Sequence, residues 1–374
     1  MSDPLKIIQQ NQLFKRQITL SEIGDSGQQK LQDTRVVVIG CGGLGTVAAS
    51  YLAGSGVGSI HLVDFDRVAV TNLHRQLFYS IYDIDKPKIE ILKDHIQRIA
   101  PFTSVTFTKA AAVKDTIFEI LEKGDIILDC TDSLPVKYLI NDACVLKDKI
   151  LVYGSLFKYD GYVATFNVQG ENGLSANLRD AFPEISAQAV PNCAEAGTLN
   201  TIVGIIGLMQ ANEVLKLVTG IGKPLINELL IYNSLENSQF KMKLKMSEDS
   251  PVERKKRFSE IFEKETYYDA GCEVQREDLL VSAGELKKWL VSAEDKKVLH
   301  IISVIEDLGA ELPFEVAERI PFSKFDAQRI ALRLDAHYVI VCNKGITSYT
   351  AALALKEKYQ NINIYSLEKG IENY

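Results

Sequence analysis

The chain has six cysteines among its 374 residues, but no two of them are spaced as C-x-x-C. This spacing offers neither a zinc-knuckle pair nor the framework of a disulfide-stapled secreted domain. The N-terminal stretch MSDPLKIIQQNQ also lacks the basic-then-apolar order of a signal peptide. Together these absences predict a cytoplasmic protein with reduced thiols.

An excess of positive charge is also missing. Lysine and arginine number 42 against 49 aspartate and glutamate residues, and the net charge is −7. This balance argues against non-specific binding to nucleic acid or to an anionic membrane. The most apolar helical candidate, residues 199–218, is interrupted by amide and charged side chains. It is therefore predicted to be a core or interface helix and not a membrane span.

A glycine-rich turn near the N-terminus organises the first part of the chain. The run at 36–39 is short and β-branched, which predicts a strand buried on both faces, and GCGGLG follows at 40–45 before an Ala- and Leu-rich helical segment. Such glycines let backbone N–H groups approach phosphate at a helix N-terminus. A second strand, 59–63, ends at Asp64, where an acid usually binds ribose hydroxyls. These features predict a nucleotide site.

A glycine loop and one acid are also typical of an NAD-dependent oxidoreductase, which is the first alternative. The residues that follow favour a triphosphate, because Asn72 and Arg75 lie just past the acid and Lys88 opens a helix after Pro87. A lysine at a helix start opposes the helix dipole unless it meets an anion. Asp132, at the end of a strand at 125–128, is expected to need a cation such as Mg²⁺ between itself and phosphate.

In order and spacing, these motifs resemble the ThiF/MoeB family, the bacterial relatives of the ubiquitin-activating enzymes. The resemblance covers about the first two thirds of the chain and rests on GCGGLG at 40–45, DFD at 64–66, NLHRQ at 72–76, KPK at 86–88 and DCTD at 129–132. It implies a Rossmann-like α/β fold with a mixed sheet, and an ATP site. The expected ATP-binding residues are Gly40, Gly42, Gly43, Gly45, Asp64, Asp66, Asn72, Arg75, Gln76, Lys88 and Asp132, with Mg²⁺ held through Asp132.

Two further roles are implied by the same resemblance. The Arg-Gln pair at 16–17 matches a motif whose arginine reaches the nucleotide of a neighbouring subunit, so Arg16 implies a homodimer; alone, it would be a solvated charge. Cys193 precedes a helix N-terminus in a C-x-E-A-G pattern, where some family members use a cysteine in sulfur or acyl transfer. A half-buried structural cysteine is the alternative for Cys193.

One departure from the family concerns zinc. Family members commonly carry two C-x-x-C pairs that hold a structural zinc, one in the crossover stretch and one after the last strand. The corresponding segments here read GLSANLRDAF at 173–182 and KLKMSEDSPVE at 243–253. Because both pairs are missing together, the sequence predicts no zinc site, and it leaves open how the crossover is held.

Composition predicts a charged linker with some helical tendency at 247–270, which separates residues 1–246, an adenylation domain by the resemblance, from a small α/β domain at 271–374. In the last, Cys342 ends a strand and opens a loop above a helix N-terminus, an arrangement suited to a thiolate or persulfide. C-x-x-G-x-x-S here resembles the active loop of rhodanese-like sulfurtransferases. The domain departs from that family after its first strand, where the usual D-V-R-E begins with Ser303, and inside the loop, where the usual arginines are Asn343 and Thr347; Lys344 is the remaining cation of the loop. A domain that only docks partners is therefore the alternative.

The combined resemblance implies ATP-dependent adenylation of a ubiquitin-like sulfur-carrier protein at its C-terminal Gly-Gly carboxylate. Cys342, with Cys193 as a candidate participant, would then deliver sulfur obtained from a persulfide donor such as a cysteine desulfurase. The pathway expected is thiamine or molybdopterin synthesis. A family member acting on a small molecule or a tRNA base is a third alternative; the acidic pI near 5.5 and the fused sulfurtransferase-like domain weigh against a tRNA substrate.

Overall fold

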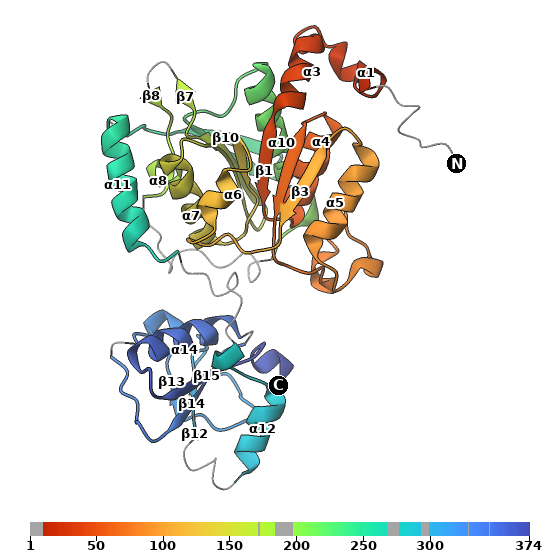
Figure 1. The fold of residues 1–374 in the computed structure, drawn as a ribbon. Helices are drawn as coiled ribbons and strands as arrows, with labels where there is room; N and C mark the ends of the chain where they lie inside the picture. Colours follow the sequence, from red (N-terminus) through yellow and green to blue (C-terminus); the bar gives the residue numbers. More distant parts are fainter. Residues whose placement is uncertain are drawn as a thin grey trace. The chain divides into compact units, whose positions relative to one another are not determined.

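The computed structural model describes residues 10–170, 173–183, 197–247, 249–267, 277–292, 299–327, 329–343 and 345–374. The chain divides into two units, Met1–Tyr268 and Asp269–Tyr374 (Figure 1). Each unit has its own sheet and its own apolar core, and each is described by itself below.

An eight-stranded mixed sheet forms the frame of the first unit, in the order β10-β9-β6-β5-β4-β1-β2-β3. Its strands are β1 Arg35–Ile39, β2 Ser59–Val63, β3 Ser104–Thr108, β4 Ile126–Asp129, β5 Ile150–Phe157, β6 Asp160–Phe166, β9 Glu228–Asn233 and β10 Ser238–Lys243. The strands from β1 to β5 pair in parallel, whereas β6, β9 and β10 are added antiparallel. The prediction of parallel strands first and antiparallel strands after is confirmed.

Helices complete the first unit, together with a short hairpin of β7 Gln169–Gly170 and β8 Gly173–Leu174. The helices are α1 Gln10–Leu13, α2 Lys15–Ile18, α3 Gly24–Asp33, α4 Gly43–Gly54, α5 Lys88–Ile99, α6 Ile117–Leu121, α7 Leu134–Leu146, α8 Leu178–Ala181, α10 Asn200–Thr219 and α11 Pro251–Lys264. In α5, for example, Ile89, Leu92 and Ile96 repeat every three or four residues and are all buried.

Alternation along the strands sets the two faces of this sheet. Val36 and Val38 of β1, with Leu62 of β2 and Leu128 of β4, belong to one apolar cluster with α3, α4, α5 and α10. Side chains at the intervening positions point to the opposite face, where α7 packs on β4 and β5 and against α6. The sheet is therefore covered on both sides, which explains why its parallel strands read as continuous apolar runs.

Helix α10 is, within the described ranges, the one helix long and apolar enough to cross a membrane by length and composition. Core helices pass the same test. Here α10 packs against α4, β5 and β6, and its Ile202, Val203, Ile206 and Val214 side chains lie in the apolar core. It has the core position expected from its sequence.

The segment expected to be a linker contains α11, which belongs to the first unit. Phe258 and Phe262 of α11 are buried, and the helix packs against α7. Phe262 also contacts the rings of Phe118 and Tyr267. The first unit thus extends past the expected boundary at 246 to Tyr268, because an amphipathic helix in a charge-dense segment buries its apolar side.

The second unit has a five-stranded, fully parallel sheet in the order β11-β15-β14-β12-β13. Its elements are β11 Leu280–Val281, α12 Ala283–Val291, β12 Leu299–Ser303, β13 Glu318–Arg319, β14 His337–Val341, α14 Ile346–Lys358 and β15 Asn363–Leu367. Alternate residues of β14 divide between two apolar clusters, Ile340 with the α14 side and Val339 with the α12 side. The predicted small α/β unit is therefore present.

Candidate active sites

The glycine loop lies between β1 and α4, where close packing requires glycine at defined positions. Gly40 has φ +93°, and a Cβ on Gly45 would lie 1.8 Å from the Gly40 carbonyl oxygen. A Cβ on Gly43 would lie 2.3 Å from Val203 of α10. At Gly42 the single neighbour is the Gln76 amide at 3.4 Å, so this part of the loop is open. The loop thus presents bare backbone beside the N-terminus of α4, as a phosphate site requires.

Asp64, which follows β2, accepts two backbone hydrogen bonds that shape this loop. Cys41 N–H donates to Oδ2 at 2.6 Å, and Asp66 N–H donates to Oδ1 at 2.7 Å. Burial raises the pKa of Asp64, while the nearby Lys88 ammonium opposes the rise. Asp64 therefore positions the glycine loop. The ribose contact predicted from the sequence would be a further role of the same carboxylate.

Lys88, at the start of α5, has the anion that its position on the helix calls for. Its Nζ lies 2.7 Å from Asp66 Oδ2, and the lysine is 3% exposed. The alternative of a solvated surface lysine is thereby excluded. Because Asp66 remains half exposed, the pair places a cation and an anion next to the glycine loop and Asp64.

The turn at 72–76 also packs against the glycine loop. The Asn72 carbonyl accepts hydrogen bonds from the N–H groups of Arg75 and Gln76. A Cβ on Gly43 would lie 3.2 Å from the Arg75 carbonyl, and Arg75 Nη1 donates to the Thr71 carbonyl at 3.0 Å. Gln76 is buried, and its Oε1 has no hydrogen-bond partner in the structure. The structure therefore places the Arg75 backbone and the Gln76 amide, whose oxygen is unsatisfied, beside the loop.

The loop after β4 reaches the same place. A Cβ on Gly40 would lie 2.8 Å from the Cys130 carbonyl oxygen and 3.1 Å from Thr131 N. Asp132 follows directly and is exposed. Since β1 lies between β2 and β4, the chain crosses to opposite sides of β1 here, and such a switch point is where ligands bind in open α/β sheets.

Three residues that the sequence did not single out support this region. Tyr79 is buried, and its hydroxyl donates to the Cys41 carbonyl at 2.7 Å. Lys137 of α7 lies 3.2 Å from Asp129 Oδ2 and is also buried. Gln210 of α10 donates to the Asp129 carbonyl at 2.8 Å. For Lys137 and Gln210, the sequence signal was a polar residue in an otherwise apolar helix, α7 or α10.

Arg16 lies away from the glycine loop. It is exposed on α2, while its neighbour Phe14 packs beside Gly56 and Gln17 donates to the Ser55 carbonyl at 2.9 Å. These contacts place α2 past the C-terminal end of α4, and α4 spans about 18 Å from there to the glycine loop. Within one chain, the structure does not bring Arg16 to the glycine loop.

In the second unit, Cys342 follows β14 and its sulfur lies in a cradle of donors. Gly345 N–H donates to Sγ at 3.1 Å, Ser348 N–H donates at 3.3 Å, and the Ser348 hydroxyl lies 3.2 Å away. Ser348 belongs to the first turn of α14. Backbone donors at a helix N-terminus stabilise a negatively charged sulfur, so the predicted anion cradle is present.

The other cysteines differ from Cys342. All four described free cysteines are buried, but the recorded contacts of Cys41 and Cys130 Sγ are with acceptors, and burial raises the pKa of the Cys41, Cys130 and Cys144 thiols. These three are apolar core residues with little thiolate character. Cys193 and Lys344 lie outside the described residues, so their predicted roles stay predictions.

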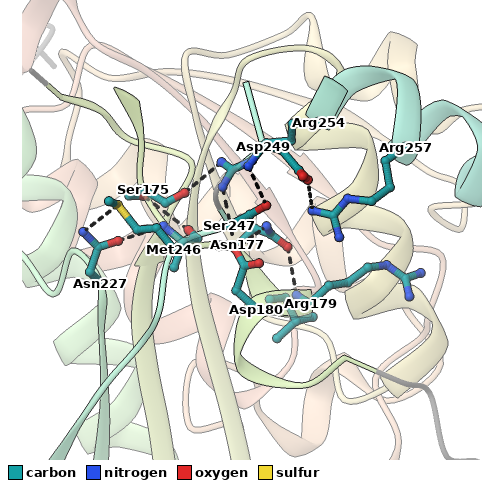
Figure 2. A network of polar contacts seen from close by, with 12 residues as sticks. Ser175, Asn177, Arg179, Asp180, Asn227, Met246, Ser247, Asp249, Arg254 and Arg257 are labelled. Atoms are coloured by element: carbon teal, nitrogen blue, oxygen red, sulfur yellow. Dashed lines mark hydrogen bonds and ion pairs between the residues drawn. The ribbon is translucent and has the colours of Figure 1, made fainter. Parts of the chain in front are cut away.

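A polar network joins the two segments in which the resemblance would place zinc (Figure 2). Arg254 of α11 is 2% exposed, and its Nη1 donates to the Ser175 carbonyl at 3.0 Å. Its Nη2 lies 3.8 Å from Asp180 Oδ2. Asn227 accepts from Ala176 N–H at 2.8 Å and contacts Met246 Sδ at 3.4 Å. Side chains thus hold the crossover stretch to the chain that follows β10.

A second buried pair extends the network to α7. Arg179 donates to both oxygens of Asp142, with its shortest contact at 2.7 Å, and the Tyr267 hydroxyl donates to the same carboxylate at 2.6 Å. No group of three potential His, Cys, Asp or Glu metal ligands occurs in the described part of the chain. The absence of zinc stays a prediction, and the network answers how the described crossover residues are held.

The mixed sheet, with a glycine loop at its switch point, defines a Rossmann-type α/β protein. A family model described as ThiF family matches residues 14–252. The chain is 32% identical over 355 residues to "Probable adenylyltransferase/sulfurtransferase MoeZ" of Mycobacterium tuberculosis, covering 92% of this chain and 88% of that protein. The chain belongs to the ThiF family, as its motifs predicted.

Two further comparisons agree with this assignment. "Sulfur carrier protein adenylyltransferase" of Thermus thermophilus is 39% identical over 243 residues, covering 64% of this chain and 89% of that protein. The crystal structure titled "E. coli MccB + ATP" has a TM-score of 0.51 at 23% identity, covering 59% of this chain and 67% of that chain. The second likeness shows a shared fold. The similarity to the mycobacterial protein, whose name includes sulfurtransferase, covers 92% of this chain and so extends into the second unit.

Proposed function

We propose that this protein adenylates the C-terminal Gly-Gly carboxylate of a ubiquitin-like sulfur-carrier protein and then supplies it with sulfur. The observation that carries the first half is the meeting of three loops, after β1, β2 and β4, around the open glycine backbone. Lys88 supplies positive charge there, and Arg75 belongs to the turn that packs against the loop. The names of the mycobacterial and Thermus relatives support the same activity.

The adenylation step needs alignment and charge stabilisation more than a side-chain nucleophile. The carrier carboxylate attacks the α-phosphorus of ATP, the bond from that phosphorus to the bridging oxygen breaks, and pyrophosphate leaves. Gly42, Gly43 and Gly45 approach the phosphates, and Asp64 holds the ribose. Asn72, Gln76 and the cations Arg75 and Lys88 contact the triphosphate, where positive charge stabilises the departing pyrophosphate.

Asp132 fits a role in holding Mg²⁺. It is exposed and directly follows Thr131, whose backbone packs against Gly40 at the switch point, and Mg²⁺ in such sites commonly takes one or two carboxylates together with substrate phosphates. When bound, the ion neutralises phosphate charge. The position of Arg16, away from its own glycine loop, favours a homodimer in which it serves the partner's nucleotide.

Sulfur delivery belongs to Cys342. Its thiolate attacks the terminal sulfur of a donor persulfide R–S–SH, such as that of a cysteine desulfurase, the donor S–S bond breaks, and R–S⁻ leaves. The product is Cys342–S–SH, with no net oxidation. Cys193 is a candidate for the later handover to the carrier, in the cytoplasm, for thiamine or molybdopterin synthesis.

The first experiment is pyrophosphate release by the full chain with ATP, Mg²⁺ and a sulfur carrier ending in Gly-Gly. The same carrier without its last glycine should give no release. Arg75→Ala should lower the rate roughly a hundredfold, as expected when a donor that stabilises developing charge is lost. Arg35→Ala is the matched control, because Arg35 is exposed and begins β1, at the end of the strand away from the glycine loop.

Equal release with both carriers would contradict the proposed substrate. ATP binding without pyrophosphate release would support the nucleotide assignment but contradict the sulfur carrier as substrate. NAD binding without ATP binding would favour the oxidoreductase alternative. Adenylation without any Cys342 persulfide would favour a second unit that only docks partners.

A further inference from the structure

The Cys342 cradle continues into a buried pair of hydroxyls that the resemblance did not assign. Ser348 Oγ lies 3.2 Å from Cys342 Sγ and 2.9 Å from Ser366 Oγ. Ser348 and Ser366 are both fully buried, and Cys342 is 4% exposed. Ser366 comes from β15, the strand next to β14, so the contact joins residues 18 positions apart.

The charge on the sulfur decides which hydroxyl donates. A thiolate or persulfide anion can only accept hydrogen bonds, so the Ser348 hydroxyl must turn its proton toward sulfur. The Ser348 oxygen is then free to accept the proton of the Ser366 hydroxyl. Two hydroxyls aligned in one direction polarise each other, and hydrogen bonds to a charged acceptor are stronger than those between neutral groups.

We propose that Ser348 is a catalytic residue of the proposed sulfur transfer, donating a hydrogen bond to the Cys342 sulfur anion, and that Ser366 positions it. This inference rests on the proposed function of the second unit. It assigns to neutral hydroxyls part of the stabilisation for which rhodanese-like loops commonly use arginine. The polar contacts recorded for Sγ, within the described residues, all come from uncharged donors.

The predicted consequence is a dependence between the two serines. Ser348→Ala removes the donor to sulfur, and loss of one hydrogen bond to a charged group should slow persulfide formation about tenfold. Ser366→Ala leaves Ser348 in place but less well oriented, and should slow it about threefold. The double variant should be no slower than Ser348→Ala, because Ser366 acts only through Ser348.

The experiment loads the full-length protein with glutathione persulfide and follows the mass gain of one sulfur atom on Cys342. Ser282→Ala is the control, since Ser282 lies in the same unit and the recorded hydrogen bonds of its side chain are with Glu285 at the start of α12. It should load at the rate of the unmodified protein. Thermal melting of each variant checks the fold, and Ser366→Ala alone carries the test if Ser348→Ala does not fold.

Two results would overturn the inference. Loading of Ser348→Ala at the unmodified rate would remove the catalytic role, and rate losses that multiply in the double variant would show two independent structural effects. If the unmodified protein forms no persulfide on Cys342, sulfur transfer itself fails, and this inference fails with it. Normal loading of the unmodified protein with unchanged variants would overturn only the role of the serines.

Discussion

Arg254→Met removes a guanidinium that is almost wholly enclosed between α11 and the crossover stretch. The side chain is 2% exposed, donates to the Ser175 carbonyl at 3.0 Å and lies 3.8 Å from the Asp180 carboxylate. Methionine has a similar length and fills much of the space without the charge. We therefore expect the loss to reflect the broken polar contacts and not a cavity.

The size of the effect follows from burial. Removing one partner of a buried ion pair costs about 3–5 kcal/mol, because the other charge is left without compensation. Arg257, three residues along α11, pairs with Asp249 at 2.9 Å but is 43% exposed, and such a pair contributes about 0–1 kcal/mol. Arg257→Met is thus a matched control on the same helix.

The assay is thermal unfolding of the full chain followed by calorimetry, reading the transition of the first unit. For a unit of this size, a loss of 3–5 kcal/mol lowers Tm by roughly 6–20 °C, against a few degrees at most for Arg257→Met. Equal shifts for the two variants would refute the reasoning, because they would show that burial of Arg254 does not determine its contribution.

The same variant has a predicted pH dependence. Burial raises the pKa of Asp180 above its usual 3.8, and Arg254 opposes that rise. Without Arg254 the folded pKa rises further, so ionising Asp180 costs folding free energy as pH rises through that value. The Tm deficit of Arg254→Met should therefore grow as pH rises above the usual carboxyl pKa of 3.8. A deficit independent of pH would show that Asp180 is not its source.

Three other predictions concern the first unit. Gly45→Ala should abolish measurable ATP binding in equilibrium dialysis, since its Cβ would lie 1.8 Å from the Gly40 carbonyl; unchanged affinity would contradict the packing of the loop. Tyr79→Phe should weaken ATP binding about 3- to 10-fold by releasing the Cys41 carbonyl, and an unchanged Kd would mean that the hydroxyl does not position the loop. Burial lowers the pKa of His61 below 6.5, so the unfolded chain takes up this proton first and stability falls as pH drops below that value. His61→Gln should flatten the slope of Tm against pH in this range, and an unaltered slope would assign it to other groups.

Local sequence patterns predicted most of the strands and helices. The β-branched run before the glycine loop predicted β1, and the apolar spacing of Ile89, Leu92 and Ile96 predicted α5. Both follow from elementary periodicity, because burial on one or two faces requires apolar residues at set intervals. The change from crossover helices to tight hairpins likewise predicted the change from parallel to antiparallel pairing.

Partner choice across the chain was beyond such patterns. The sequence marked Lys88 as a cation in need of an anion, but only the fold brings Asp66 to within 2.7 Å of it. It marked α11 as a charged linker, because composition does not reveal that Arg254 turns inward to meet Ser175.

The sequence alone determined the kind of fold, the glycine loop and the loop that carries Cys342, since each is written in contiguous residues whose chemistry is local. The tertiary structure alone decided that Tyr79 supports the glycine loop and that Ser348 and Ser366 meet behind the thiol. These contacts depend on how neighbouring strands and helices pack, and hydrogen bonds between buried groups form only once that packing has excluded water and set the distances.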